Sequence, residues 1–123
     1  MTPTTLEPVR DIAHLDALIA ASSDRPLLLF EHSRSCGTSH EAIDELQAHL
    51  AEAPRDATYA IVTVQGQREL SDAIAERFQL RHETPQVLLV RDGQMVWSAS
   101  HFRVTSDAIA RAIDEASAAV ATR

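Results

Sequence analysis

The stretch Leu27-Leu28-Leu29-Phe30-Glu31-His32-Ser33-Arg34-Ser35-Cys36-Gly37-Thr38-Ser39 joins an apolar segment to the only cysteine of the chain. Its four leading apolar residues are typical of a central strand that is covered on both faces. Beyond Cys36, apolar residues recur at helical spacing, at Ile43, Leu46 and Leu50. Cys36 is therefore predicted between a strand and a helix, beside the unpaired N–H groups of the first helical turn. Their positive potential favours thiolate over thiol, so this sulfur is a candidate nucleophile.

The flanking segments continue an alternation of strand and helix. A short edge strand is expected over Leu6 to Val9, limited by Pro8, and a helical pattern then runs to about Ser22. β-forming residues fill Thr58 to Val64, and an amphipathic helix follows, with apolar positions at Leu70, Ala73, Ile74 and Phe78. Strand, helix and strand in this order predict a parallel pair with a right-handed crossover.

The last third of the chain predicts a hairpin and a closing helix. Gln86 to Val90 and Gln94 to Ser98 flank Asp92-Gly93, a strong hairpin signal, and an apolar helical stripe follows from Ile109. The order β-α-β-α-β-α-β-β-α is that of the thioredoxin fold, an α/β fold with a mixed central sheet and helices on both faces. We expect a single thioredoxin-like domain over residues 1–123.

In such sheets, ligands and reactive residues lie outside the carboxyl ends of the parallel strands, where Cys36 is predicted to lie. The start of its helix is open at this point. Thr38 and Glu41 fit a capping box, which would begin the helix two residues beyond the sulfur. Either start leaves the thiol near the positive end of the helix.

Composition narrows the classes of function. The 123 residues carry a formal net charge of −7, and every basic residue is arginine, so no basic stripe indicates nucleic-acid binding. The apolar runs are too short to cross a bilayer, and a cytoplasmic location is expected. One cysteine forms neither an internal disulfide nor a four-ligand zinc site, so we expect no metal and no bound cofactor. Any disulfide chemistry must be intermolecular.

A second motif, Thr84-Pro85, precedes the predicted hairpin. Proline at a strand start marks a bend or a cis peptide bond, since proline cannot donate to a sheet ladder. The chain between Cys36 and Pro85 accommodates a helix, a strand and a second helix, so both elements can meet at one sheet end. A cis bond there would leave the Thr84 backbone free to pair with an extended substrate held as a mixed disulfide.

Together these motifs resemble the monothiol bacilliredoxin family, thioredoxin-fold proteins of bacteria that use bacillithiol as their low-molecular-weight thiol. The likeness spans most of the chain. It rests on four segments: His32-Ser33 at a strand end, the tetrapeptide Cys36-Gly37-Thr38-Ser39, the segment His82-Glu83-Thr84-Pro85-Gln86, and Ser100-His101-Phe102 before the closing helix. The chain departs from the family where Gly37 replaces the usual proline and Thr84 the more frequent serine. Gly37 loosens the first turn of the helix.

The resemblance implies an enzyme, a monothiol thiol-disulfide oxidoreductase that removes bacillithiol from protein mixed disulfides. Cys36 would attack the bacillithiol sulfur of a bacillithiolated client protein, release the client thiol and retain bacillithiol as a mixed disulfide. Bacillithiol is thus a co-substrate. A second bacillithiol molecule or a disulfide reductase would regenerate the enzyme, because Ser39 cannot resolve the disulfide as a second cysteine would.

Several residues near Cys36 are candidates for supporting or substrate-binding roles. Gly37, Thr38, Thr84 and Pro85 are candidates because of their place in the two motifs, and four further side chains are considered below. Ser39 either bonds the thiolate or is an ordinary first-turn hydroxyl. Arg34 suits bidentate capture of a malate-like carboxylate and would favour the thiolate, although a solvated arginine is the usual case. His32 and His101 either meet the carboxylates of bacillithiol or serve packing and capping. His40 is expected to be a solvated helix residue rather than a catalytic one.

Two other functions remain open from the sequence. Two monothiol domains can bridge a [2Fe–2S] cluster through Cys36 and a small thiol, as monothiol glutaredoxins do, and such a protein would be coloured. The chain can also be a non-catalytic interaction module whose cysteine alkylates like an ordinary thiol.

Overall fold

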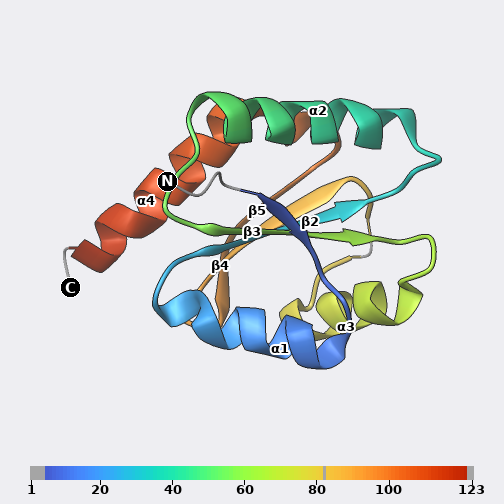
Figure 1. The fold of residues 1–123 in the computed structure, drawn as a ribbon, viewed down its shortest axis with the longest axis horizontal. Helices are drawn as coiled ribbons and strands as arrows, with labels where there is room; N and C mark the ends of the chain where they lie inside the picture. Colours follow the sequence, from blue (N-terminus) through green and yellow to red (C-terminus); the bar gives the residue numbers. More distant parts are fainter. Residues whose placement is uncertain (1–4, 82, 122–123) are drawn as a thin grey trace.

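The computed structural model describes residues 5–81 and 83–121, which form a five-stranded sheet between two pairs of helices (Figure 1). His82, part of the segment that carries the family likeness, lies outside the described residues. The elements in chain order are β1 Leu6–Pro8, α1 Ile12–Ala20, the 3-10 turn η1 Ala21–Ser23, β2 Leu27–His32, α2 Gly37–Glu52, β3 Thr58–Thr63, α3 Arg68–Phe78, β4 Gln86–Arg91, β5 Gln94–Ser100, the 3-10 turn η2 His101–Arg103 and α4 Ser106–Ala121.

The strands are arranged in the order β1-β3-β2-β4-β5. β1 and β2 both pair with β3 in parallel, whereas β4 pairs antiparallel with β2 and β5 antiparallel with β4. β2 is the central strand, and all six of its residues are buried. The apolar sequence predicts this burial for Leu27 to Phe30, whereas Glu31 and His32 are buried polar residues. Glu31 pairs with Gln86 in this register, so the start of β4 lies beside the end of β2.

Each face of the sheet has its own apolar core, because successive side chains of a strand point to opposite faces. Leu28 and Phe30 pack against α2 and α4, whereas Leu27 and Leu29 pack against α1 and α3. Figure 1 shows α2 and α4 together on one side of the sheet, with α1 and α3 on the other. None of the described helices combines the length and the hydropathy that a bilayer crossing requires.

The sequence predicted this architecture correctly. The element order and the mixed sheet agree with the thioredoxin-like expectation, and the observed turn at Asp92-Gly93 joins β4 to β5. The differences are at element ends: β1 and β3 each stop one residue early, and β5 extends to Ser100. Such ends depend on individual hydrogen bonds, which periodicity does not resolve.

Candidate active site

Cys36 is the N-cap residue of α2, in extended conformation with φ −109° and ψ 121°. Its carbonyl accepts hydrogen bonds from the amides of Ser39 at 3.1 Å and His40 at 3.2 Å, the first bonds of the helix. The helix begins at Gly37, which decides between the two starts that the sequence left open, and the capping box at Thr38 is not formed. Cys36 as a residue is partly exposed.

Ser39 holds the end of β2 against the first turn of α2. Its hydroxyl is fully buried, accepts a hydrogen bond from the Ser33 amide at 3.0 Å and shares one of 2.7 Å with Nδ1 of His32. The sequence left open whether Ser39 bonds the thiolate or is an ordinary first-turn hydroxyl, and in the structure its hydroxyl bonds the end of β2 and Ser33. Ser39 fixes the position of the loop that carries Cys36.

His32 is a packing residue. Its ring stacks on Phe30, meets His40 edge to face and is only 7% exposed. Burial, with the charges of His40 and Arg34, lowers the pKa of His32 below its usual value. The imidazole is therefore neutral near pH 7, where it offers no charge to a carboxylate. Of the two roles considered for His32, the structure supports packing.

Two further side chains bond the backbone of the loop before Cys36. Gln65, just beyond β3, accepts a hydrogen bond from the Arg34 amide at 3.0 Å and donates to the hydroxyls of Ser33 and Ser35. His40 donates from Nε2 to the Arg34 carbonyl at 2.8 Å, since a carbonyl can only accept. His40 is thus a loop-positioning residue rather than simply a solvated one. Sequence reasoning missed Gln65, although it follows the parallel strand next to β2.

The Thr84-Pro85 peptide bond is cis, one of the two forms that the sequence allowed. Pro85 directly precedes Gln86, so the β2–β4 register puts it at the carboxyl end of β2, where the Cys36 loop begins. Its carbonyl accepts a hydrogen bond from the His101 amide at 3.0 Å. Between described residues, the backbone of Thr84 makes no hydrogen bond, which leaves an amide and a carbonyl for an extended ligand.

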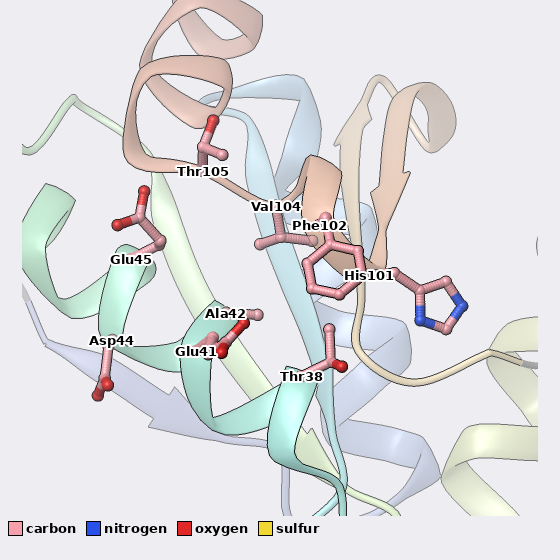
Figure 2. A pocket seen from close by; sticks show the side chains of 9 residues that line it. All are labelled: Thr38, Glu41, Ala42, Asp44, Glu45, His101, Phe102, Val104 and Thr105. Carbon is pink, nitrogen blue, oxygen red and sulfur yellow. The ribbon is translucent and has the colours of Figure 1, made fainter.

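A groove of about 370 Å³ separates α2 from η2 and the start of α4 (Figure 2). It begins at Thr38, and the residues that line it are Thr38, Glu41, Ala42, Asp44, Glu45, His101, Phe102, Val104 and Thr105. Phe102 is 78% exposed, and Figure 2 shows its ring beside Thr38. The structure thereby brings the predicted residues Thr38 and His101 to one cavity, next to the cysteine and the cis-proline.

A second cavity, of about 420 Å³, lies on the α3 side of the Cys36 loop and is lined by Val64, Gln65, Arg68, Ser71 and Asp72. Gln65 belongs to this cavity and also bonds the Arg34 amide, so the predicted Arg34 lies at its border. The Arg34 side chain is exposed and makes no ion pair with another described residue. Its guanidinium is therefore available to an anionic ligand.

Glu31 is an acidic side chain in the apolar interior, only 2% exposed. It accepts a hydrogen bond from the Ser71 hydroxyl at 2.8 Å. Burial raises the pKa of Glu31 from 4.5 to about 7, and the Ser71 bond opposes this rise. The carboxyl therefore changes its protonation state near neutral pH.

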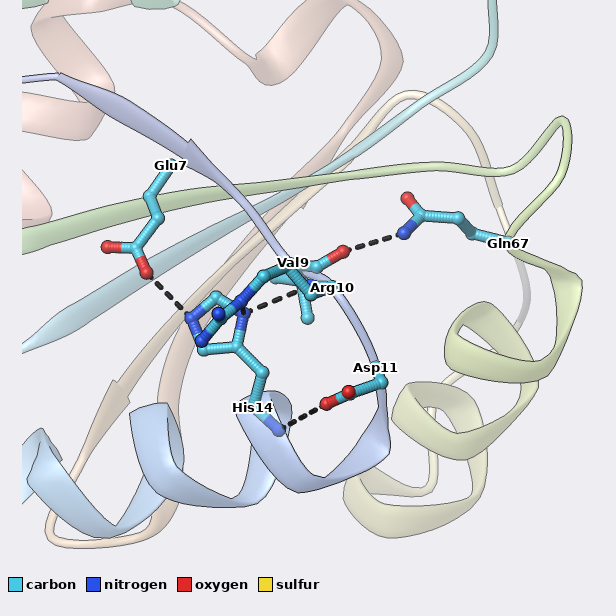
Figure 3. A network of polar contacts seen from close by, with 6 residues as sticks. All are labelled: Glu7, Val9, Arg10, Asp11, His14 and Gln67. Carbon is cyan, nitrogen blue, oxygen red and sulfur yellow. Dashed lines mark hydrogen bonds and ion pairs between the residues drawn. The ribbon is translucent and has the colours of Figure 1, made fainter.

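Another polar network, drawn in Figure 3, connects β1 to α1 and α3 and serves the fold. The His14 ring accepts from the Arg10 amide at 3.0 Å and contacts Glu7 at 2.6 Å, while its amide donates to the N-cap Asp11. Gln67 donates to the Val9 carbonyl at 2.6 Å. Among the described residues, no three histidine, cysteine or acidic side chains gather as metal ligands.

The family model for the monothiol bacilliredoxin BrxC matches residues 7–109. The chain belongs to the monothiol bacilliredoxin family. This match contains the thiol, the cis-proline and η2, and it confirms the resemblance drawn from the sequence. Bacilliredoxins are thiol-disulfide oxidoreductases, so the chain is a member of a redox family.

Solved structures agree on the fold. A structure described as a proposed oxidoreductase with a thioredoxin fold is 29% identical, with a TM-score of 0.78 over 87% of this chain and 92% of that one. Thioredoxin from Fasciola hepatica is 19% identical, with a TM-score of 0.70 over 89% of this chain and 98% of its own. A mutant thioredoxin from Halobacterium salinarum NRC-1 is 21% identical, with a TM-score of 0.71 over 94% and 93%. The last two similarities establish the thioredoxin fold alone.

Proposed function

We propose that this bacilliredoxin removes bacillithiol from client proteins through Cys36. The observation that carries the proposal is a partly exposed cysteine at the N-cap of a sixteen-residue helix, at the sheet end where the cis-proline also lies. Backbone amides at the N-terminus of a helix favour negative charge, and reactive cysteines are typically found in such positions. A thiolate is the nucleophile of disulfide exchange.

In the proposed reaction, the Cys36 thiolate attacks the bacillithiol sulfur of the mixed disulfide. A new bond forms between Sγ of Cys36 and this sulfur, while the client–bacillithiol S–S bond breaks. The client sulfur leaves with the electron pair as a thiolate and takes a proton from water. Client cysteine is reduced and Cys36 is oxidised, so no external oxidant or reductant takes part in this step.

The backbone of Thr84, which bonds no other described residue, supports the binding of an extended segment beside Cys36, in the manner of an added strand. We assign the carboxylates of bacillithiol to the side of the loop where Arg34 and Arg68 lie, because both side chains are exposed and no ion pair between described residues neutralises them. Arginine binds carboxylates in bidentate geometry.

Regeneration requires a thiol from outside this chain. Cys36 is the only cysteine, and the hydroxyl of Ser39, three residues on, cannot attack a disulfide as a thiolate does. A second bacillithiol molecule would release bacillithiol disulfide and restore the thiolate. Alternatively, a disulfide reductase that supplies its own thiols would reduce the disulfide between Cys36 and bacillithiol directly.

The test is mass spectrometry of the protein mixed with a bacillithiolated client. We expect one bacillithiol adduct on Cys36 and a matching amount of free client thiol. Cys36→Ala should give no adduct and no release above background, whereas Ser117→Ala, at an exposed position of α4 that keeps the thiol and its loop, should react like wild type. Equal client release by wild type and Cys36→Ala would refute the proposal.

A further inference from the structure

The groove between α2 and η2 differs in charge from the cavity beside Arg68. We propose that the groove receives the client polypeptide and selects clients that carry a basic side chain and an apolar side chain near the modified cysteine. This inference rests on the proposed function and adds a substrate class to it. The groove is placed for that task because it begins at Thr38, two residues beyond the thiol.

Three carboxylates line the groove, from Glu41, Asp44 and Glu45. The Glu45 carboxylate accepts a hydrogen bond from the Ser106 amide at 3.0 Å, whereas the side chains of Glu41 and Asp44 make no bond or ion pair with another described residue. His101 is the basic side chain among the lining residues. A concave surface with this excess of negative charge concentrates cationic groups.

Phe102 supplies an apolar contact at the same place. It is 78% exposed, and its ring lies beside Thr38 in Figure 2. An aromatic ring that is mostly in water gains free energy when a partner covers it, and such rings are frequent at protein interfaces. The combination of Phe102 with Glu41 and Asp44 fits a segment in which a basic residue and an apolar residue lie close together.

Charge also distinguishes the client from other occupants. The carboxylates of bacillithiol would be repelled by Glu41 and Asp44, so the co-substrate is better placed on the Arg68 side. A second copy of this chain would bring a net charge of −7 to an acidic surface. A client segment with a basic residue is repelled in neither way. Because the groove begins at Thr38, two residues beyond Cys36, one segment can reach both the groove and the thiol.

The experiment compares bacillithiolated peptides that have the same length and the same cysteine. One carries arginine and leucine near the cysteine, a second glutamate and leucine, and a third arginine and serine. Rate constants for transfer to Cys36 are measured at low ionic strength in wild type, in Glu41→Gln/Asp44→Asn and in Phe102→Ala. The mixed disulfide of bacillithiol with a small uncharged thiol, which has no peptide part, normalises each rate and so separates peptide selection from thiol reactivity.

We expect the arginine–leucine peptide to react about tenfold faster than the glutamate–leucine peptide in wild type, because both free carboxylates act on it. This ratio should fall to about twofold in Glu41→Gln/Asp44→Asn and also in 0.5 M salt. Glu69→Gln/Glu76→Gln, which removes two exposed carboxylates of α3 on the opposite face of the sheet, should retain the wild-type ratio. Phe102→Ala should remove the advantage of leucine over serine.

Equal rates for the basic and acidic peptides in wild type would overturn the inference while leaving the proposed function intact. A Phe102-dependent dimer in size-exclusion chromatography would also overturn it, by assigning the groove to a second copy. A failure of Cys36 to react with any of the peptides or with the small disulfide would refute the proposed function itself.

Discussion

Replacing Glu31 with glutamine removes a carboxyl that is buried in the sheet and has no opposite charge beside it in the described structure. Burial raises its pKa from 4.5 to about 7, so the folded protein holds this proton more tightly than the unfolded chain. Between these two values stability falls as pH rises, because the native state binds more protons than the unfolded state. The difference between the two pKa values corresponds to a loss of about 3 kcal/mol in the free energy of unfolding, and this loss reaches its full size above pH 7.

Glutamine has nearly the same shape and keeps an oxygen that can accept the Ser71 hydrogen bond. Glu31→Gln should therefore raise the free energy of unfolding by up to about 3 kcal/mol at pH 8. The increase should be small at pH 4.5, where Glu31 is protonated in the folded state and about half protonated in the unfolded chain. Urea unfolding of wild type and Glu31→Gln across this pH range measures the difference in the free energy of unfolding. The other titrating groups are the same in both proteins, so their contributions cancel.

The matched control is Glu69→Gln, at an exposed position on α3, which should change stability little at any pH. A stability difference between Glu31→Gln and wild type that stays constant from pH 4.5 to pH 8 would refute the reasoning. It would mean that Glu31 ionises alike in the folded and unfolded states.

Two further predictions concern the first turn of α2. Gly37→Pro should stabilise the protein by about 0.4–1 kcal/mol, because the first helical position suits proline, Cys36 already has the extended backbone that must precede one, and an added Cβ meets nothing within 4 Å. Thermal unfolding measures this, and a lower midpoint would contradict it. Ser39→Ala should lower the free energy of unfolding, measured in urea, by about 1–3 kcal/mol, since the Ser33 amide and His32 lose a buried hydrogen-bond partner. A stability equal to that of wild type would show that these bonds contribute nothing.

Much of the fold is readable because its signals are local and strong. The apolar run Leu27 to Phe30 predicted a central strand, and it is fully buried at the middle of the sheet. Asp92-Gly93 predicted the hairpin, and both residues adopt the positive φ that such a turn requires. The start of α2 could not be predicted from the sequence, because the same residues allow a helix capped by Cys36 and a helix capped by Thr38 with Glu41.

The site is only partly readable because its contacts join residues far apart in the chain. The order of elements indicated that Cys36 and Pro85 share one end of the sheet. Gln65, which bonds Arg34 from 31 positions away, gave no sequence signal of its own beyond its place after a parallel strand. The role of Ser39 was also undecided, since a hydroxyl three residues beyond a cysteine can turn towards either the sulfur or the strand.

The sequence alone determined the thioredoxin-like order of strands and helices, the position of the single thiol at a strand–helix junction and the family to which the chain belongs. Side-chain periodicity and turn chemistry carry this information within a few residues of each position. The tertiary structure decided which hydroxyls and amides bond the Cys36 loop, that Glu31 titrates near neutral pH, and that acidic and apolar side chains meet in one groove beside the thiol. These properties depend on burial and on distances between distant segments, which exist only after the sheet and its helices have packed together.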